Sequence, residues 1–294
     1  MDQNFFLKRY EQLGSKETFF ALKQSLRVNT LKITQKELVT RLNRKGVVLE
    51  KIPFATNGYW ISKTHFSLGA SVEYLLGHYY LQEAAAQIPV EVLNPKPEDT
   101  VLDACASPGG KTTQLAQLME NKGLIVSFEK NNLRIPALKS HLERIGVSNV
   151  IAYNTDVVKV RTFGIAFDKI LLDAPCSGNF IADPDWLQKK NIEDVEKCTG
   201  IQKILLDACT KVLKTNGILV YSTCSLEPEE NEMIIDWALE NLPLKLEKID
   251  LKIGSLGLTN IFGKKLNKEI EKCKRFWPSK TKTQGFFIAK MVKK

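Results

Sequence analysis

The sequence predicts an α/β domain with a mostly parallel sheet, preceded by a smaller α+β unit. From residue 100 onward, short apolar runs alternate with helix-forming stretches, which is the pattern of βαβ units. Small and polar residues gather directly after those apolar runs, at the sheet edge where α/β domains bind ligands. Residues 1–75 have shorter, mixed patterns and a basic surplus. We therefore place a first unit at 1–78 and a second at 79–294.

The first unit is predicted to contain short helices and strands. Phe5, Phe6 and Tyr10 recur at helical spacing, and Thr34 with Glu37 forms a capping box before a second helix. Alternating or β-prone residues predict strands over 25–31, 47–52 and 59–62.

The second unit begins with a strong helix former, QEAAAQ at 82–87, which leads to Val92 and is ended by Pro95 and Pro97. An apolar run from Val101 then enters a turn of small residues and the start of a helix. The elements that follow are predicted as strand 124–129, helix 131–145, strand 150–153, strand 169–173, helix 192–213, strand 218–222 and helix 228–239.

Composition indicates an intracellular globular protein. The chain has 294 residues, of which 44% are hydrophobic and 26% charged. It has no apolar run near the ~20 residues of a membrane span and no secretory start, so we expect a cytoplasmic protein without a membrane partner. The six cysteines show no C-x-x-C spacing, which predicts neither a metal site nor a disulfide framework.

Charge is distributed unevenly along the chain. Residues 1–75 carry a net charge of +6 and residues 245–294 carry +10, whereas residues 76–244 carry −7. Two basic segments around an acidic middle suit a polyanion held by the periphery, although Lys-rich ends that only keep a protein in solution fit equally well. The candidate phosphate contacts are the basic side chains at 8, 9, 27, 41, 44 and 45 and in 264–282.

Two ligands compete for the turn after Val101. Gly110-Lys111-Thr112 has the ending of a phosphate-binding P-loop, but Cys105 stands where that loop has its first glycine, and Pro108 lacks an amide N–H. A turn for an adenosyl cofactor needs small residues and an acid about 20 residues further on for the ribose, at the end of the next strand. Glu129 occupies that place, so the adenosyl ligand explains more of the sequence than an NTPase does.

Two thiols follow predicted strands. Cys176 lies in DAPCSG after the strand ending at Asp173, and Cys224 lies in STCS after the strand ending at Ser222. A thiolate that adds to C6 of cytosine makes C5 nucleophilic toward a methyl donor, and an acid near the ring stabilises the adduct. The chain offers thiol, acid and adenosyl turn, but the residues alone leave open which thiol attacks.

These motifs resemble the Sun (Fmu) family of S-adenosylmethionine-dependent RNA cytosine-5 methyltransferases. The resemblance covers nearly the whole chain and rests on RVNT at 27–30, YYLQEAAAQIP at 79–89, DACASPGGKTTQLA at 103–116, DAPCSG at 173–178, YSTCSLEPEENE at 221–232 and GFFIAK at 285–290. It implies a Rossmann-like methyltransferase domain after an RNA-binding unit. The short chain is similar to archaeal members that modify tRNA.

The resemblance also implies a role for each matched position. Cys224 would be the nucleophile, Cys176 would assist release of the methylated RNA, and Asp173 would face cofactor and base. S-adenosyl-L-methionine would be held by Cys105, Ala106, Ser107, Pro108, Gly109, Gly110, Lys111, Glu129, Arg134, Asp156 and Asp173.

Two segments depart from the family pattern, at Asn179–Asp185 and between Ser279 and Gln284, and both bear on RNA contacts. We expect a monomer that acts on RNA, most of all tRNA, without a metal. The alternatives are a ribosomal RNA substrate, a DNA methyltransferase that uses Cys176, a P-loop-like NTPase and a catalytically silent RNA-binding protein.

Overall fold

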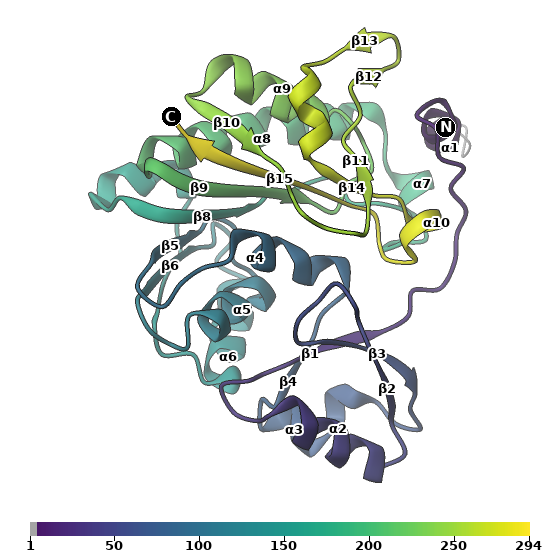
Figure 1. Cartoon of the computed structure of the whole chain (residues 1–294), viewed down its shortest axis with the longest axis vertical. Coiled ribbons are helices and arrows are strands. Elements are labelled where there is room, and N and C mark those ends of the chain that lie inside the picture. The colour runs from purple at the N-terminus through teal and green to yellow at the C-terminus, as the bar shows by residue number, and fades with distance from the viewer. Residues whose placement is uncertain (1–4) are drawn as a thin grey trace.

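A computed structural model describes residues 5–294, which form a small antiparallel sheet and a large mixed sheet (Figure 1). The small sheet has the strand order β2-β3-β1-β4, in which every neighbouring pair is antiparallel. Its strands are β1 (Ser25–Val28), β2 (Val48–Lys51), β3 (Gly58–Lys63) and β4 (Tyr79–Leu81). The short elements beside it are α2 (Gln35–Arg44), η1 (Leu68–Ala70) and α3 (Val72–Leu75).

The start of α2 confirms a sequence prediction. The Thr34 hydroxyl accepts a hydrogen bond from the Glu37 backbone N–H, and the Glu37 carboxylate accepts one from the Thr34 N–H, which completes the capping box. The small sheet itself continues to Leu81, because β4 pairs with β1. It therefore extends beyond the expected boundary at residue 78.

The large sheet has the strand order β11-β14-β15-β9-β8-β5-β6-β7, with β10 paired to β15. Strands β5 to β9 are parallel and confirm the predicted α/β pattern: β5 (Thr100–Asp103), β6 (Leu124–Phe128), β7 (Val150–Tyr153), β8 (Phe167–Asp173) and β9 (Leu213–Thr223). The chain runs from β5 outward to β7 and then returns to β8 on the other side of β5. This reversal places the carboxyl ends of β5 and β8 at a topological switch point, where open α/β sheets bind ligands.

The C-terminal strands were not predicted. They extend the sheet in antiparallel fashion: β15 (Phe286–Lys293) pairs with β9, β14 (Lys274–Phe276) and β10 (Leu244–Glu247) pair with β15, and β11 (Ser255–Leu256) pairs with β14. A separate pair is formed by β12 (Asn260–Ile261) and β13 (Lys264–Lys265).

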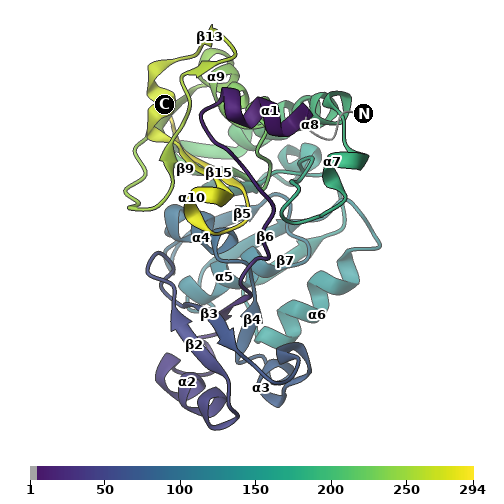
Figure 2. The same cartoon turned by 90° about the vertical axis from the view of Figure 1, so that its right-hand side faces the viewer.

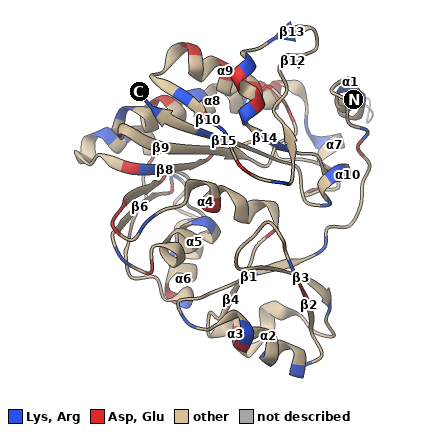
Figure 3. Cartoon of the chain, in the orientation of Figure 1, with Lys and Arg blue, Asp and Glu red and all other residues tan. Residues whose placement is uncertain are grey.

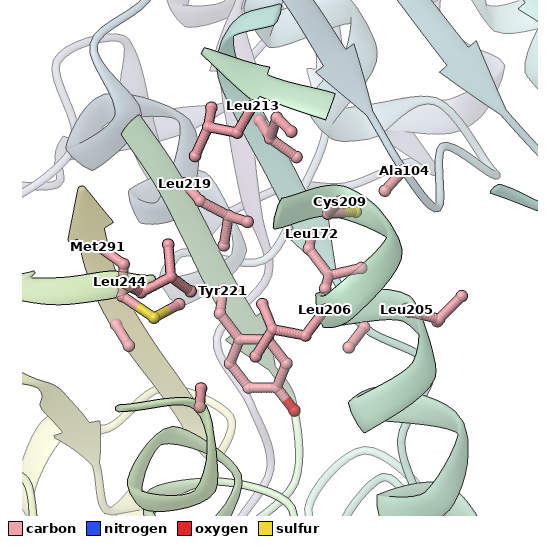
Figure 4. Close-up of a cluster of buried hydrophobic side chains, with 14 of the residues drawn as sticks. Ala104, Leu172, Leu205, Leu206, Cys209, Leu213, Leu219, Tyr221, Leu244 and Met291 are labelled. Carbon is pink, nitrogen blue, oxygen red and sulfur yellow. The ribbon is translucent and has the colours of Figure 1, made fainter. Parts of the chain in front are cut away.

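Helices cover both faces of the large sheet. One face packs against α4 (Ile88–Leu93) and α5 (Gly110–Leu118), with Val101 of β5 facing that layer. The opposite face, which includes Leu102, packs against η3 (Val157–Phe163), α8 (Ile192–Val212) and α9 (Glu232–Asn241). Figure 4 shows this second core, where Leu206 and Cys209 of α8 meet side chains of β8 and β9. The other helical segments are η2 (Ala85–Gln87), α6 (Ile135–Ile145), α7 (Trp186–Lys189), η4 (Lys268–Lys272) and α10 (Pro278–Thr281).

Three predicted helices begin later than expected, since side chains bond to the backbone before each of them. The segment at 82–87 is a bend and a 3-10 turn, because the Glu83 carboxylate accepts hydrogen bonds from the N–H groups of Ala85 and Ala86. The helix expected from 131 begins at Ile135, because the Glu129 carboxylate accepts a hydrogen bond from the Asn131 N–H in the preceding turn. The helix expected from 228 begins at Glu232.

The first helix lies against the large-sheet part of the molecule. Helix α1 (Phe5–Gln12) packs Phe6 and Tyr10 into a cluster with Phe180, Trp186 and Trp277. From there residues 13–24 run down the side of the molecule to β1 (Figures 1 and 2). We call residues 5–24 the N-terminal strap. The strap ties the two sheets together, because it is anchored on one and leads into the other.

No helix within residues 5–294 is both long enough and apolar enough to cross a membrane. In the same residues, no group of three or more His, Cys, Asp and Glu side chains is arranged to hold a metal ion.

Candidate active site

The turn after β5 begins at Ala104 and leads into α5. Gly109 has a φ of +106°, and a Cβ there would lie 3.1 Å from Leu138 of α6, so this position requires glycine. No side chain caps the N-terminus of α5. The first N–H groups of that helix therefore provide donors and positive dipole at the switch point.

Asp103, at the end of β5, is a buried acid that the sequence reasoning passed over. Its Oδ2 accepts a hydrogen bond of 2.7 Å from the Thr112 hydroxyl, while its Oδ1 has no partner within the described residues. Burial raises the pKa of Asp103 to about 6. An orphaned carboxylate oxygen beside a helix N-terminus indicates a polar ligand at this place.

Lys111 and Asp173 connect the turn to the neighbouring strands. The Lys111 Nζ lies 2.7 Å from Asp173 Oδ2, and the Ser222 hydroxyl donates a hydrogen bond of 2.7 Å to Asp173 Oδ1. Asp173 thus links the ends of β8 and β9 to the start of α5.

The two predicted thiols meet. Cys176 follows β8 and Cys224 follows β9, and the register of these parallel strands brings the two Sγ atoms to 3.2 Å. The Asn179 side-chain amide donates a hydrogen bond of 2.6 Å to the Cys224 carbonyl and so holds the second loop. The first departure from the family pattern therefore supports the thiol loops from within the protein.

The surroundings distinguish the two thiols. The hydrogen bond with Cys176 lowers the pKa of Cys224, and the positive charge of Lys111 acts in the same direction against burial and Asp173. The same hydrogen bond and burial raise the pKa of Cys176 well above its ordinary value. Cys224 is accordingly the thiol that ionises first.

A cavity of about 530 Å³ lies on one side of the turn. Cys105, Glu129, Arg134 and Asp156 line it, together with apolar side chains that include Phe128 and Leu205. Glu129 is buried, and its Oε1 accepts a hydrogen bond from the Asn131 N–H while Oε2 lies 3.6 Å from Arg134. Hydroxyl groups of a ligand could bind this carboxylate.

Arg134 and Asp156 are held by neighbours at the rim of this cavity. Arg134 donates a hydrogen bond of 2.7 Å to the Ser107 carbonyl and so braces the turn. Asp156 accepts a hydrogen bond from the Val158 N–H and pairs with Lys130 at 2.8 Å.

A second cavity, of about 220 Å³, lies on the other side of the turn. Its walls include Cys105, Ala106, Ser107, Pro108, Gly110, Lys111 and Asp173. Cys105 lines both cavities, so the turn separates two halves of one bipartite site. Gly109 lines neither and faces α6 instead.

Sequence reasoning missed part of the second cavity. Tyr80, Gln82 and Glu83 contribute to its wall from the end of β4. The motif that contains them was noticed, but its helix-forming composition concealed their role. Ile201 and Leu205 line the first cavity from α8. In the sequence they are only two apolar residues spaced by four, a pattern that indicates a helix face and not a ligand site.

Several candidate phosphate contacts are internal. Arg27 and Arg275 are buried, so neither can reach RNA, which corrects the prediction for these two. Arg9 pairs with Glu227 and Glu229 and anchors the strap. Arg41 and Arg44 of α2 and Lys280 and Lys282 near α10 are exposed, and Figure 3 marks the basic positions of both helices.

The second departure from the family pattern is also explained by internal contacts. The Ser279 N–H and hydroxyl donate to the Glu17 carboxylate of the strap, at 2.9 and 2.7 Å. The Gln284 N–H donates to Glu83.

Comparison with known proteins gives consistent matches along the chain. Residues 90–292 match the model of the 16S rRNA methyltransferase RsmB/F family, and residues 3–84 match that of the N-terminal domain of 16S rRNA methyltransferase RsmF.

Two relatives show how differently the chain covers its matches. A tRNA (cytosine(49)-C(5))-methyltransferase of Pyrococcus abyssi is 38% identical over 98% of this chain and 95% of its own length. A mouse 28S rRNA (cytosine-C(5))-methyltransferase is 37% identical over 92% of this chain. The chain spans only 35% of that mouse protein, and 34% of a human 28S rRNA relative.

Solved structures agree with the fold. A methyltransferase homolog protein from Pyrococcus horikoshii is 44% identical, with a TM-score of 0.87 over 94% of this chain and 88% of that one. NSun6 from Pyrococcus horikoshii, in a structure with SFG, is 28% identical, with a TM-score of 0.82 over 93% and 91% of the two chains.

Proposed function

The chain belongs to the RsmB/F family of 16S rRNA methyltransferases, and from this premise we propose that it transfers a methyl group from S-adenosyl-L-methionine to C5 of a cytosine in RNA. The observation that carries the proposal is the pair of thiols 3.2 Å apart at the switch-point edge, beside the turn and its cavities. P-loop chemistry is set aside, because both matching models describe methyltransferases.

The site has the donors and acceptors that S-adenosyl-L-methionine requires. The buried Glu129 carboxylate is suited to accept hydrogen bonds from the ribose hydroxyls. Asp156 lines the same cavity and would approach the adenine. The uncapped start of α5 suits the carboxylate of the amino-acid part. The related structure with SFG, an analogue of this cofactor, supports the assignment. When bound, the cofactor supplies an electrophilic methyl group.

Cys224 is the proposed nucleophile. Its sulfur accepts a hydrogen bond from Cys176 and faces the charge of Lys111, and both effects favour the thiolate that adds to C6 of the base. Cys176 keeps its proton at neutral pH, so it can give that proton to the Cys224 sulfur as the C6–S bond breaks, while the C5 proton passes to water. Asp173, which is held by Lys111 and Ser222, would bind the ring edge of the cytosine.

The substrate we propose is tRNA. The archaeal tRNA relative matches this chain nearly end to end, whereas the mammalian rRNA relatives are about three times as long. The exposed cations Arg41, Arg44, Lys280 and Lys282 would contact phosphates of the RNA. The target base would have to leave its stack to reach Cys224.

Methyl transfer to defined nucleic acids tests this proposal. The purified chain is incubated with labelled S-adenosyl-L-methionine and tRNA, rRNA fragments or duplex DNA, and the products are mapped by bisulfite sequencing. We expect 5-methylcytosine in tRNA. Methylation of rRNA alone would overturn the choice of substrate, while transfer only to DNA, or to no nucleic acid, would overturn the function.

A further inference from the structure

Two arginines are almost completely buried, and they differ in their partners. Arg275 is 0% exposed and forms an ion pair with the equally buried Glu232. Arg27 is 1% exposed, and none of the carboxylates in residues 5–294 forms an ion pair with it. A buried cation without an anion is expensive for a folded protein, so this arrangement calls for an explanation.

Within residues 5–294, the Arg27 guanidinium bonds only to neutral acceptors. It donates to the Gly110 carbonyl at 2.7 Å, the Thr113 hydroxyl at 2.8 Å and the Gln117 side-chain oxygen at 3.1 Å, all on α5. It also donates to the side-chain oxygen of Gln82. Arg27 lies on β1 of the small sheet, so one side chain of the N-terminal part holds the first turn of the helix that bounds the site.

The guanidinium stands directly behind the wall of the second cavity. Gly110 and Gln82, which accept its hydrogen bonds, both line that cavity. Tyr80 lines it too, and the Arg27 guanidinium carbon lies 5.5 Å from the centre of that ring. Residues in contact with the guanidinium therefore form part of the cavity wall.

Burial lowers the pKa of Arg27 to about 9, and Arg144 adds to this, while Tyr80 and Glu91 oppose it. The side chain thus remains charged at neutral pH. Its charge acts through a low-dielectric wall, where electrostatic interactions are weakly screened. An anion bound in the second cavity would offset part of the penalty for burying this cation.

We propose that Arg27 is a positioning residue of the cofactor turn, whose guanidinium fixes the Gly110 carbonyl from behind and whose charge is balanced by the carboxylate of the bound cofactor. This inference rests on the proposed function, because it takes S-adenosyl-L-methionine as the ligand. It assigns to the small sheet a part in cofactor binding besides any contact with RNA.

The competing explanation is that Arg27 only staples the two sheets together. A ligand pair distinguishes the two roles. S-adenosyl-L-homocysteine carries the amino-acid carboxylate, whereas 5′-methylthioadenosine has the same nucleoside and thioether without the amino-acid part. A structural defect would weaken the binding of both ligands, but loss of the charge would weaken only the binding of S-adenosyl-L-homocysteine.

The test is calorimetric titration of the intact wild-type chain and of Arg27→Gln with both ligands. We expect Arg27→Gln to lower the affinity for S-adenosyl-L-homocysteine about tenfold and to change the affinity for 5′-methylthioadenosine less than twofold. Lys32→Gln is the matched control. Lys32 also joins the two parts, through hydrogen bonds to the Leu76 and Arg144 carbonyls, but it is exposed and lines neither cavity. Its ratio of the two affinities should equal that of the wild type.

Equal losses for the two ligands in Arg27→Gln, or no loss, would overturn the inference. Arg27→Lys keeps the charge and serves if the Gln variant does not fold: it should retain the wild-type ratio, and a tenfold drop in that ratio would contradict a role for the charge. A wild-type chain that binds neither ligand would instead refute the proposed cofactor, so the two failures are distinguishable.

Discussion

The loops that carry the thiols and the turn that flanks the cavities differ in how completely their polar groups are satisfied. Around Cys176 and Cys224, the protein supplies the partners: Glu230 accepts from the Ser177 N–H and hydroxyl, and Asn179 donates to the Cys224 carbonyl. Around the turn, Asp103 Oδ1 has no partner within residues 5–294, α5 lacks a cap, and Arg27 lacks an anion. This contrast supports the proposal that the first region is preassembled for chemistry and that a ligand completes the second.

The largest effect should come from the thiol loops. Cys224→Ala is expected to reduce methyl transfer by about a thousandfold or more, because it removes the proposed nucleophile and the remaining thiol, Cys176, keeps its proton. Cys176→Ala should instead leave a protein–RNA adduct that survives a denaturing gel. Labelled methyl incorporation and the gel measure the two results. If Cys224→Ala still methylates and Cys176→Ala turns over normally, the assigned roles are wrong.

Substitutions in the turn region should change the affinity for the cofactor. Glu129→Gln removes the charge proposed to hold the ribose, and we expect affinity for S-adenosyl-L-homocysteine to fall about tenfold to a hundredfold. Calorimetry measures it, and Glu120→Gln is a matched control, since Glu120 is exposed and pairs with Lys122. Equal affinities of Glu129→Gln and wild type would remove Glu129 from the site.

A substitution that disturbs the loop around Cys224 should lower the rate of methyl transfer and leave cofactor affinity unchanged. Asn179→Ala removes the hydrogen bond to the Cys224 carbonyl and the acceptor for the Ile181 N–H. We expect kcat to fall about tenfold through misplacement of the thiol, with cofactor affinity unchanged. A loss of cofactor affinity without a change in kcat would contradict the separation of the two regions.

A smaller effect should appear in the pH dependence of stability. Burial raises the pKa of Glu83 to about 7 from an ordinary 4.5. The folded chain therefore keeps a proton that the unfolded chain releases, so the free energy of unfolding falls as the pH rises from about 4.5 to 7, by at most about 1.4 kcal/mol per pH unit. Urea unfolding of wild type and Glu83→Gln should show a flatter profile for the variant. Parallel profiles would mean that Glu83 is already ionised near pH 5.

The parallel strands were predictable because each is a short apolar run between turn residues, and the parallel arrangement predicted that both thiols lie at one edge. The 3.2 Å contact between the two thiols was not predictable, because it depends on the register that pairs Asp173 with Ser222. Arg27 was mistaken for a surface cation. All four residues of β1 are buried, which alternation in the sequence does not reveal. Strand β15 was noticed only as a motif, since its antiparallel pairing depends on distant β9.

The N-terminal strap also has a consequence for synthesis on the ribosome. Tyr10 of the first helix bonds to Glu227, and Glu17 of the strap bonds to Ser279, so these partners lie more than 200 residues further along the chain. At roughly 5–20 residues per second, that helix leaves the ribosome some tens of seconds before they exist. Until then Phe6 and Tyr10 lack these partners, and the nascent chain offers chaperones an apolar helix.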